Sequence, residues 1–470
     1  MNRMGIDIGT TSISIVLLDT KTGKLMAKET VNHDSFLNAS RTAACVHKHA
    51  AQWNANVRFT DTIPEGRIQD PEKIFITVVQ KIEELIRNYG CPEGIGVTGQ
   101  MHGMLYVDEN GNAVSPLYTW QDGRGNLPLE NGRTSVELLK DKLRNPGMLA
   151  SGYGIVTHYY LGVKGEIPEN AVKMTTISDY IVMKLCGRKS PVMGIDMAAS
   201  WGGFDLEKKE FRYEELAQAG VDISYLPRVE KRHCLAGKTT GIENIPAGIP
   251  VALSIGDNQA SFLGAVRELH DAVLINVGTG SQVSFASERY VPCEDNLELR
   301  PCTDDTYLLV GASLCGGRAY AMLEQFYREA AGNGDSSYYD VMYRQAGEFI
   351  KKYGAEAAWN VRTTFSGTRS NPKERGQISN ISVENFYPGA LTVGVMKGIL
   401  QELYEQYQTM SRLTGKKAAY LVGSGNGLRR NPIMQKLAEE IFGLPLGIPE
   451  YQEEAACGAA YRLSDLNGLG

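Results

Sequence analysis

The sequence has no apolar run long enough to cross a membrane. Its longest early run, Ile13–Leu18, has only the length of a strand, whereas a membrane-spanning helix needs about 20 residues. The beginning of the chain also lacks the charged segment and long apolar stretch of a secretory signal. We therefore expect a cytoplasmic protein with no membrane partner.

Basic residues are not in excess either. The chain has 48 Lys and Arg residues against 54 Asp and Glu residues, which gives a formal net charge of −6. Nucleic acids and anionic membranes favour a basic surface, so we expect no nucleic-acid partner. A small anionic ligand is compatible with this charge, because backbone N–H groups can bind it locally.

Metal-binding cysteine patterns are missing as well. None of the eight cysteines forms a Cys-x-x-Cys pair or lies at zinc-ligand spacing from a histidine. The cysteines are therefore expected to be reduced and mostly buried thiols, as in other cytosolic proteins.

The sequence does contain a repeated order of elements. Each half opens with apolar strands joined by a Gly-containing turn, and each continues to a helix and a further strand. The elements are predicted at Met4–Asp7, Ser12–Leu18, Leu25–Thr30, Pro71–Asn88 and Gly94–Thr98 in the first half, and at Asp271–Val277, Ser281–Ala286, Val395–Tyr407, Lys417–Val422 and Pro432–Phe442 in the second.

The length of 470 residues and the hydrophobic fraction of 43% are enough for two cores. The stretch Pro246–Pro250, rich in Pro and Gly, separates the two halves. We therefore predict an N-terminal domain at residues 1–247 and a C-terminal domain at 248–470.

Two similar turns follow the first strand of each half, Asp7–Ser12 and Asn276–Ser281. Glycine lets the backbone approach a ligand, and the N–H groups of such a turn can bind an anion. Each turn alone could equally be an ordinary hairpin, but matching positions favour a pair of phosphate-binding loops. The predicted phosphate-binding residues are Gly9, Thr10 and Thr11 in the first loop, and Gly278, Thr279, Gly280 and Ser281 in the second.

The loops differ from a Walker A motif, because neither contains its Lys and neither leads into a helix. This excludes a P-loop NTPase. Asp7 by itself would repel a phosphate, so we expect it to hold a hydrated Mg²⁺ beside the first loop.

A third element is the Gly-rich turn Val422–Gly427, between a predicted strand and a predicted helix. Such a turn offers backbone against which a flat ring can lie, although similar turns are common in α/β proteins. The residues expected to contact a nucleotide there are Gly423, Ser424, Gly425 and Asn426.

In this order the three elements resemble the FGGY carbohydrate kinases, which belong to the superfamily of actin, hexokinase and heat-shock ATPases. The resemblance covers essentially the whole chain and includes the closing segment Glu454–Ala460. It implies an α/β fold of two actin/hexokinase-like (ribonuclease H-like) domains, with mixed sheets flanked by helices around a deep cleft. It further implies ATP and Mg²⁺, with the sugar mainly on the first domain, the nucleotide mainly on the second, and Gly316 among the nucleotide-binding residues.

Asp257 follows a predicted strand and begins a segment rich in small residues. From the sequence alone, a helix N-cap is the favoured explanation of this residue. The resemblance instead assigns to Asp257 the role of catalytic base. A carboxylate in that role accepts the proton of a sugar hydroxyl as the γ-phosphoryl group is transferred.

Two strings, Gly99–Gly103 and Thr119–Arg124, carry polar and aromatic side chains suited to a sugar. Gln-Met-His-Gly resembles the substrate strand of ketose kinases. Asp122 and Arg124 could instead pair with each other to brace their loop. The residues predicted to bind substrate are Gln100, Met101, His102, Trp120, Asp122, Asp257 and Asn258.

Within the family, the strings Ala150–Gly154 and Ala198–Gly202 are most similar to sedoheptulokinases, although Trp201 in the second string is also explained as scaffold. The resemblance implies phosphorylation of sedoheptulose to sedoheptulose 7-phosphate. Xylulose or another pentulose or polyol is the alternative, because Asp257-Asn258 is closer to xylulokinases. Met101-His102 replaces the Arg-Glu pair of glycerol kinases and argues against glycerol.

The chain departs from the family at two places. Lys173–Thr176 lacks the Trp that usually follows its Lys, and the segment Asp34–Arg67 looks like an insertion. His47 and His49 in that segment have no carboxylate or thiol partners at ligand spacing, so a surface or substrate-rim role is preferred to a metal site.

Two hypotheses of other classes remain. One is a sugar- or nucleotide-sensing protein without catalysis, although such proteins usually lose the base or a phosphate loop. The other is an actin-like polymer subunit, against which the intact Gln100–Gly103 string argues. The sequence leaves the oligomeric state open, with a homodimer as one option.

Overall fold

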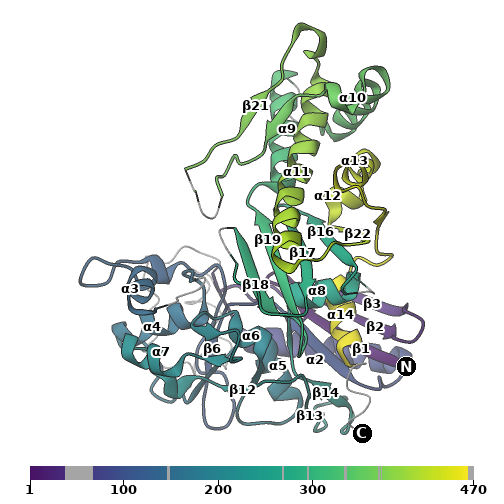
Figure 1. Ribbon diagram of the computed structural model, residues 1–470. Helices are drawn as coiled ribbons and strands as arrows, with labels where there is room; N and C mark the ends of the chain where they lie inside the picture. The colour runs from purple at the N-terminus through teal and green to yellow at the C-terminus, as the bar shows by residue number, and fades with distance from the viewer. Residues whose placement is uncertain are drawn as a thin grey trace. The chain divides into compact units, whose positions relative to one another are not determined.

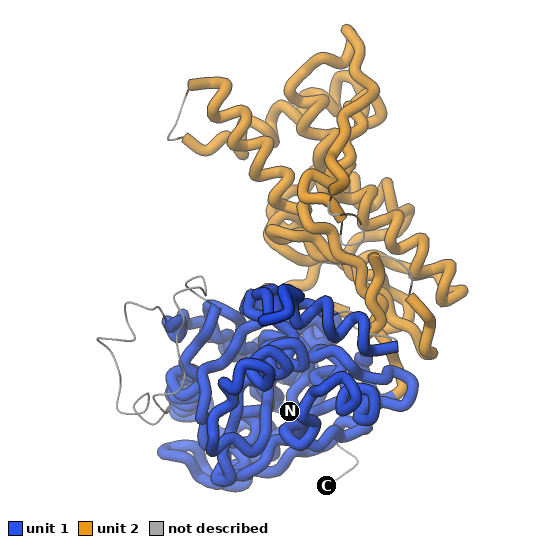
Figure 2. Tube along the Cα trace, turned by 90° about the vertical axis from the view of Figure 1, so that its left-hand side faces the viewer, with its two compact units in different colours: residues 1–264, 301–304, 453–470 blue, residues 265–300, 305–452 orange. Residues whose placement is uncertain are grey.

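The computed structural model describes residues 1–37, 67–144, 149–266, 269–293, 296–332, 336–368, 371 and 373–463. They divide into two compact units (Figure 2). Unit 1 comprises residues 1–264, 301–304 and 453–470, and unit 2 comprises residues 265–300 and 305–452. The stretch Pro246–Pro250 lies inside unit 1, and the domain boundary at residue 247 stays a prediction. His47, His49 and nearly all of the Asp34–Arg67 segment lie outside the described residues.

The sheet of unit 1 opens with the predicted antiparallel meander. Four further strands continue it on the other side of the first strand: three run parallel where they pair, and the edge strand β13 (Leu235–Lys238) is antiparallel to its neighbour. The meander consists of β1 (Asn2–Ile8), β2 (Ser12–Asp19) and β3 (Lys24–Asn32), and the parallel strands are β5 (Ile95–Gly99), β14 (Pro250–Ala252) and β15 (Ile255–Gly256).

Alternate residues of β1 face opposite sides of this sheet. Met4, Ile6 and Ile8 are fully buried in a core shared with α2 (Pro71–Tyr89) and α5 (Ile177–Leu185). α2 begins where predicted because the Asp70 carboxylate accepts hydrogen bonds from the backbone N–H groups of Glu72 and Lys73.

The opposite face of the sheet carries α14 (Glu454–Arg462), which packs on β1, β2 and β5 (Figure 1). A Cβ atom on Gly5 would lie 1.8 Å from the carbonyl oxygen of Ala456, and one on Gly96 would lie 2.0 Å from that of Ala459. The helix backbone therefore rests directly on two glycines of the sheet. The small residues that make up most of this helix allow the close approach.

Unit 2 repeats the same strand order. β16 (Ala272–Val277) pairs antiparallel with β17 (Ser281–Ser287), and β17 pairs antiparallel with β19 (Tyr307–Ser313). β22 (Tyr420–Ser424) pairs in parallel with β16, as β5 does with β1. The long helix α11 (Pro388–Thr414) covers β17 and β19 (Figure 1). Both sheets are thus mixed and flanked by helices, as expected.

The other elements complete the two units. The remaining strands are β4 (Ile68–Gln69), β6 (Leu105–Val107), β7 (Leu117–Tyr118), β8 (Lys173–Thr175), β9 (Val192–Gly194), β10 (Phe204–Asp205), β11 (Glu210–Phe211), β12 (Arg228–Glu230), β13 (Leu235–Lys238), β18 (Leu297–Pro301), β20 (Asn360–Arg362), β21 (Gln377–Ser379) and β23 (Leu446–Gly447). The remaining helices are α3 (Ser135–Lys142), α4 (Gly154–Lys164), α6 (Ile195–Ala199), α7 (Tyr213–Ala219), α8 (Asp257–Ala265), α9 (Gly316–Ala330), α10 (Tyr339–Tyr353), α12 (Asn426–Arg429) and α13 (Pro432–Phe442).

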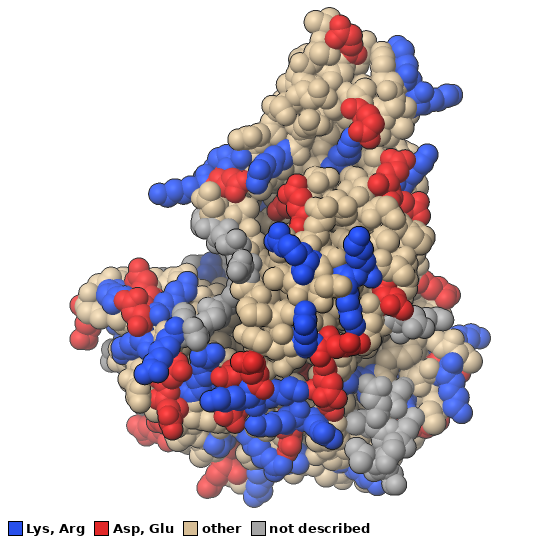
Figure 3. Space-filling model, in the orientation of Figure 1, with Lys and Arg blue, Asp and Glu red and all other residues tan. Residues whose placement is uncertain are grey.

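The surface agrees with the charge balance of the sequence. On the face drawn in Figure 3, basic and acidic side chains lie interspersed.

Within the described ranges, no helix has the length and apolar character that crossing a bilayer requires. The seven cysteines in those ranges are all free thiols.

Candidate functional site

Three neighbouring strands of unit 1 end at one edge of its sheet. Gly99 of β5 lies opposite Ile8 of β1 on one side and opposite Gly256 of β15 on the other. Parallel strands bring their carboxyl ends to the same edge, which is where ligands bind in open α/β sheets. Asp7, Gln100 and Asp257, which border these positions, are therefore brought together from distant parts of the sequence.

Asp7 and Asp257 form a pair of carboxylates at this edge. Loss of hydration raises the pKa of Asp7, and the charge of Asp257 raises it further, to about 7. Asp257 is the first residue of α8, and its Oδ1 accepts hydrogen bonds from the backbone N–H (2.7 Å) and the Nδ2 (3.2 Å) of Asn258. A cation or a proton donor bound at this pair would therefore relieve the repulsion between the two carboxylates.

The segment that leads into Asp257 is fixed from three sides. The Gly256 N–H donates to Asp196 Oδ2 at 2.7 Å, and the Thr98 hydroxyl donates to the Ile255 carbonyl at 2.7 Å. The Ser254 hydroxyl donates to Asp179 Oδ1 at 2.6 Å. Burial raises the pKa of Asp196, and it raises that of Asp179 to about 7.

The sequence did not single out these supports. Asp196 lies two residues before the string Ala198–Gly202, and Asp179 follows the helix-capping Thr176. Both positions look like ordinary helix starts, so no local signal separates them from scaffold.

The first predicted phosphate loop is a closed hairpin turn. The Gly9 N–H donates to the Ser12 carbonyl at 2.9 Å. Thr10 is held at two atoms: its carbonyl oxygen accepts from Gln69 Nε2 at 2.6 Å, and its hydroxyl oxygen accepts from Trp120 Nε1 at 3.1 Å. The turn is therefore linked by side chains to the neighbouring predicted substrate wall.

His102 has a positive φ of 73° and lies next to both strings that favoured sedoheptulokinases. Its ring stacks on that of Tyr153, with centroids 4.2 Å apart and an interplanar angle of 5°. Its Nδ1 lies 2.6 Å from the carbonyl oxygen of Ser200. A carbonyl only accepts, so Nδ1 carries the proton and Nε2 of the neutral ring is an acceptor.

Asp122 and Arg124 form the brace that was the alternative to substrate binding. Arg124 Nε and Nη2 donate to the two carboxylate oxygens of Asp122 at 2.8 and 3.1 Å, and both side chains are buried. The guanidinium also lies over the Tyr118 ring. Contact of Asp122 with a sugar stays a prediction.

Two other side chains of this region are buried. Met101 is buried, with its Sδ and Cε against Gly256. Trp201 is fully buried against Gly154 and donates to the Gly103 carbonyl at 3.1 Å, which fits its scaffold interpretation.

In unit 2, the second predicted phosphate loop adjoins the start of α9. The backbone N–H groups of Gly317 and Arg318 donate to the carbonyl oxygens of Gly278 and Thr279, both at 2.9 Å. A Cβ atom on Gly316 would lie 2.5 Å from the backbone N of Ser281. Glycine is therefore required where the helix meets the loop.

The Gly-rich turn lies beside the same loop. Asn276 and Ser424 are opposite each other in parallel strands, and Asn276 Nδ2 donates to Ser424 Oγ at 2.9 Å. Gly425 has a φ of 84° and a ψ of 148°, and a Cβ atom there would lie 2.5 Å from the carbonyl oxygen of Val277. The predicted nucleotide residues of unit 2 thus converge at one sheet edge.

Among the described residues, no group of three or more His, Cys, Asp or Glu side chains is arranged to hold a metal ion. Two of the predicted site carboxylates, Asp7 and Asp257, lie at the unit 1 edge. Two carboxylates fit Mg²⁺, since this ion usually keeps several waters and completes its coordination with phosphate oxygens.

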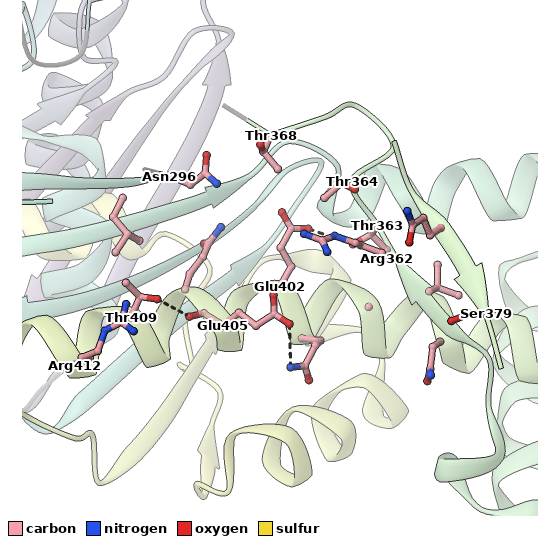
Figure 4. Close-up of a pocket in the computed structure, with 17 residues that line it drawn as sticks. Asn296, Arg362, Thr363, Thr364, Thr368, Ser379, Glu402, Glu405, Thr409 and Arg412 are labelled. Carbon is pink, nitrogen blue, oxygen red and sulfur yellow. Dashed lines mark hydrogen bonds between the residues drawn. The ribbon is translucent and has the colours of Figure 1, made fainter. Parts of the chain in front are cut away.

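Unit 2 also contains a polar pocket of about 450 Å³, lined by α11 and the strands β18, β20 and β21 (Figure 4). Glu402 Oε2 accepts hydrogen bonds there from Ser313 Oγ (2.9 Å) and Thr363 Oγ1 (3.3 Å), and burial raises the pKa of Glu402. None of the predicted site residues is among its described lining residues.

Comparison with known proteins gives a family match in both halves. The N-terminal domain of the FGGY family of carbohydrate kinases matches residues 39–264, and its C-terminal domain matches residues 273–464. The sedoheptulokinase of Mus musculus is 30% identical, covering 97% of this chain and 96% of the relative. The xylulose kinase of Staphylococcus epidermidis is 24% identical, covering 97% and 86%.

The fold is likewise similar to solved structures. The crystal structure of xylulose kinase from Rhodospirillum rubrum has a TM-score of 0.78 at 19% identity, covering 98% of this chain and 90% of that one. At this identity the likeness supports the fold alone.

Proposed function

Because the chain belongs to the FGGY family of carbohydrate kinases, we propose that it transfers the γ-phosphoryl group of ATP to a ketose, with sedoheptulose as the preferred acceptor. The products would be sedoheptulose 7-phosphate and ADP. The observation that carries the proposal is the convergence of Asp7, Gln100 and Asp257 at one edge of the unit 1 sheet.

In the proposed reaction, Asp257 accepts the proton of the terminal sugar hydroxyl. The hydroxyl oxygen forms a bond to the γ-phosphorus as the bond between that phosphorus and the β–γ bridging oxygen breaks, and ADP leaves. Asn258, whose N–H and Nδ2 donate to Asp257 Oδ1, keeps the carboxylate oriented. The hydrogen bonds that fix β15, from Gly256 to Asp196 and from Thr98 to Ile255, hold the base in position.

The sugar would lie against Gln100, His102 and Trp120. His102 Nε2 is suited to accept a hydrogen bond from a sugar hydroxyl, since Nδ1–H is committed to Ser200. Trp120 is 48% exposed and offers an aromatic face to C–H groups. Met101, Asp122 and Asn258 would complete this side of the site.

The phosphates would be bound by the two Gly-containing loops, and the adenosine by the Gly-rich turn together with Gly316. Asp7 would hold Mg²⁺ through water. When bound, this ion supplies positive charge that neutralises the phosphate oxygens. An ion there would also favour the ionised form of Asp7, which burial and the charge of Asp257 disfavour.

Sedoheptulose is favoured over xylulose by two observations. The relative that is 30% identical over nearly the whole chain is a sedoheptulokinase. The two strings that favoured this substrate contribute Tyr153 and Ser200 to the surroundings of His102. Xylulose remains the second candidate because of the Asp257-Asn258 pair.

A panel assay tests the proposal. Purified protein, ATP and Mg²⁺ are mixed with sedoheptulose, xylulose, ribulose, glycerol or gluconate, and ADP release is measured. We expect the highest kcat/KM with sedoheptulose. A higher kcat/KM with xylulose would change the proposed substrate but leave the proposed reaction unchanged. Sugar binding without ADP formation on any acceptor would contradict the proposal and favour a sensing protein.

A further inference from the structure

Gln69 connects the predicted substrate wall to the first phosphate loop. It lies at the end of β4, next to the N-cap of α2, and its side chain is fully buried. Gln69 Nε2 donates to the Thr10 carbonyl at 2.6 Å, and Gln69 Oε1 accepts from Gln100 Nε2 at 2.8 Å. Two amides thus form a continuous relay between Thr10 and Gln100.

The Thr10 carbonyl, at one end of this relay, fixes the direction of its hydrogen bonds. A backbone carbonyl only accepts hydrogen bonds, so Gln69 must turn its NH₂ group towards Thr10. Its oxygen then faces Gln100, and Gln100 must turn its own NH₂ group towards Gln69. Neither amide can flip without placing two donors or two acceptors against each other.

This direction leaves Gln100 Oε1 as the free end of the relay. Gln100 is 4% exposed, and its Oε1 has no hydrogen-bond partner among the residues that the structure describes. A buried acceptor without a partner costs about 1–3 kcal/mol. A sugar hydroxyl that donates to Gln100 Oε1 would remove that cost, so this oxygen is prepared for a donor.

Trp120 makes a second connection to the same loop residue. Its Nε1 donates to Thr10 Oγ1 at 3.1 Å. A sugar that packs on Trp120 and donates to Gln100 would thereby stiffen the side chains that hold both the carbonyl and the hydroxyl of Thr10. Thr10 in turn belongs to the loop proposed to bind phosphate.

We propose that Gln69 is a positioning residue that sets the hydrogen-bond direction of Gln100 and couples sugar binding to nucleotide binding through Thr10. The inference rests on the proposed function and adds to it a mechanism of cooperation between the two substrates. Such coupling is reciprocal, so the sugar and the nucleotide raise each other's affinity by the same factor.

The test measures this factor by binding rather than by turnover. Calorimetry gives the Kd of a non-hydrolysable ATP analogue with Mg²⁺, in the absence and in the presence of saturating sedoheptulose, or of xylulose if the panel identifies it as the better acceptor. For the wild-type protein we expect the sugar to lower this Kd by about fivefold or more, the lower part of the usual range for coupled sites.

Two substitutions interrupt the relay in different ways. Gln69→Leu removes both hydrogen bonds, and it should bring the effect of sugar on the nucleotide Kd to within about twofold of none, with a sugar Kd raised ~10-fold, the loss of about one hydrogen bond. In its ionised form, Gln69→Glu keeps an acceptor for Gln100 but cannot donate to Thr10. It should lose the coupling with a smaller change in sugar Kd.

The matched control is Thr239→Val, which removes a buried side chain's hydrogen bonds to the Pro246 carbonyl (2.6 Å) and the Ile249 N–H (3.0 Å) elsewhere in unit 1. It should retain the wild-type coupling. Unchanged coupling in both Gln69 variants, or absence of coupling in the wild-type protein, would overturn the inference. Failure of the wild-type protein to phosphorylate any sugar would be seen in the panel assay and would overturn the proposed function instead.

Discussion

Asp7 stands beside Asp257 at the edge of the unit 1 sheet, where burial and then the charge of Asp257 raise the pKa of Asp7 to about 7. The pairing of β1 and β15 with β5 brings the two residues together across 250 positions of sequence. Two carboxylates in such proximity are costly unless a cation or a proton donor is bound between them. The separate roles proposed for them, Asp7 beside the metal and Asp257 as base, lead to the first prediction.

Asp257→Asn should lower kcat by at least ~10²-fold, within the usual contribution of a general base. The amide keeps the size of the side chain but cannot accept a proton. The Kd of the ATP analogue should remain within about threefold of wild type, as measured by calorimetry. Turnover close to that of the wild-type protein would remove Asp257 from the role of base.

Asp179 should make stability depend on pH. Burial raises its folded-state pKa from 3.8 to about 7, so the stabilisation it provides is fully present below the unfolded pKa and is lost as the pH rises through 7. Asp179→Asn cannot ionise. The melting temperature of this variant minus that of wild type should therefore increase between pH 4 and pH 8, whatever the fixed cost of the substitution.

Asp19→Asn is a control of opposite sign for the pH experiment. Hydrogen bonds from the N-terminal amino group, Thr22 and Lys21 lower the pKa of Asp19 to about 2. Its stabilisation is present above the unfolded pKa and is lost as the pH falls. The stability deficit of Asp19→Asn relative to wild type should shrink as the pH falls towards 2. If the stability differences of Asp179→Asn and Asp19→Asn from wild type changed with pH in the same way, the opposite pKa shifts assigned to these two residues would be refuted.

Gly96→Ala should destabilise the protein by about 1–3 kcal/mol or more, since the added methyl would meet backbone that cannot yield easily. The new Cβ would lie 2.0 Å from the Ala459 carbonyl oxygen of α14. Gly162→Ala is the control, because its Cβ would meet only Ile167 Cδ1 at 3.7 Å, inside a helix that favours alanine. Urea unfolding measures both, and equal stabilities would contradict this packing.

Gly425→Ala should weaken nucleotide binding and also lower stability. Its φ of 84° with a ψ of 148° is a conformation that only glycine adopts readily, and its Cβ would meet the Val277 carbonyl oxygen at 2.5 Å. The Kd of the ATP analogue should rise ~10-fold or more, the equivalent of about 1.4 kcal/mol.

The control for this glycine is Gly443→Ala. Gly443 also has a positive φ, 63°, but an added Cβ would have no atom within 4 Å. This variant should cost some stability and leave nucleotide binding unchanged. If Gly425→Ala and Gly443→Ala bound the ATP analogue with equal affinity, the Gly-rich turn would not be part of the nucleotide site.

Much of the fold was predictable because its signals are local. The helix at Pro432–Phe442 has the predicted bounds, and the helix predicted at Pro71–Asn88 ends one residue later, at Tyr89. Proline at the first turn and a capping side chain define both starts. The paired hairpins were found because each turn follows its strand directly, so a short window of sequence contains the whole feature.

The site was predictable only in part. The string around His102 signalled a substrate wall, but its stacking on Tyr153 and its bond to Ser200 join three segments far apart in the chain. Gln69 gave no signal at all, since it reads as the residue before a helix cap. Its function in the relay depends on the pairing of β4 with β7, which brings its side chain between Thr10 and Gln100.

The sequence by itself determined the two Gly-containing hairpins, the Gly-rich turn and the family to which they belong, because turns, caps and strand alternation depend on neighbouring residues. Only the tertiary structure decided which carboxylates and amides meet. Parallel pairing of β1, β5 and β15 aligns strand ends that are separated by up to 250 residues, and the hydrogen-bond direction of a buried amide follows from partners that no local pattern contains.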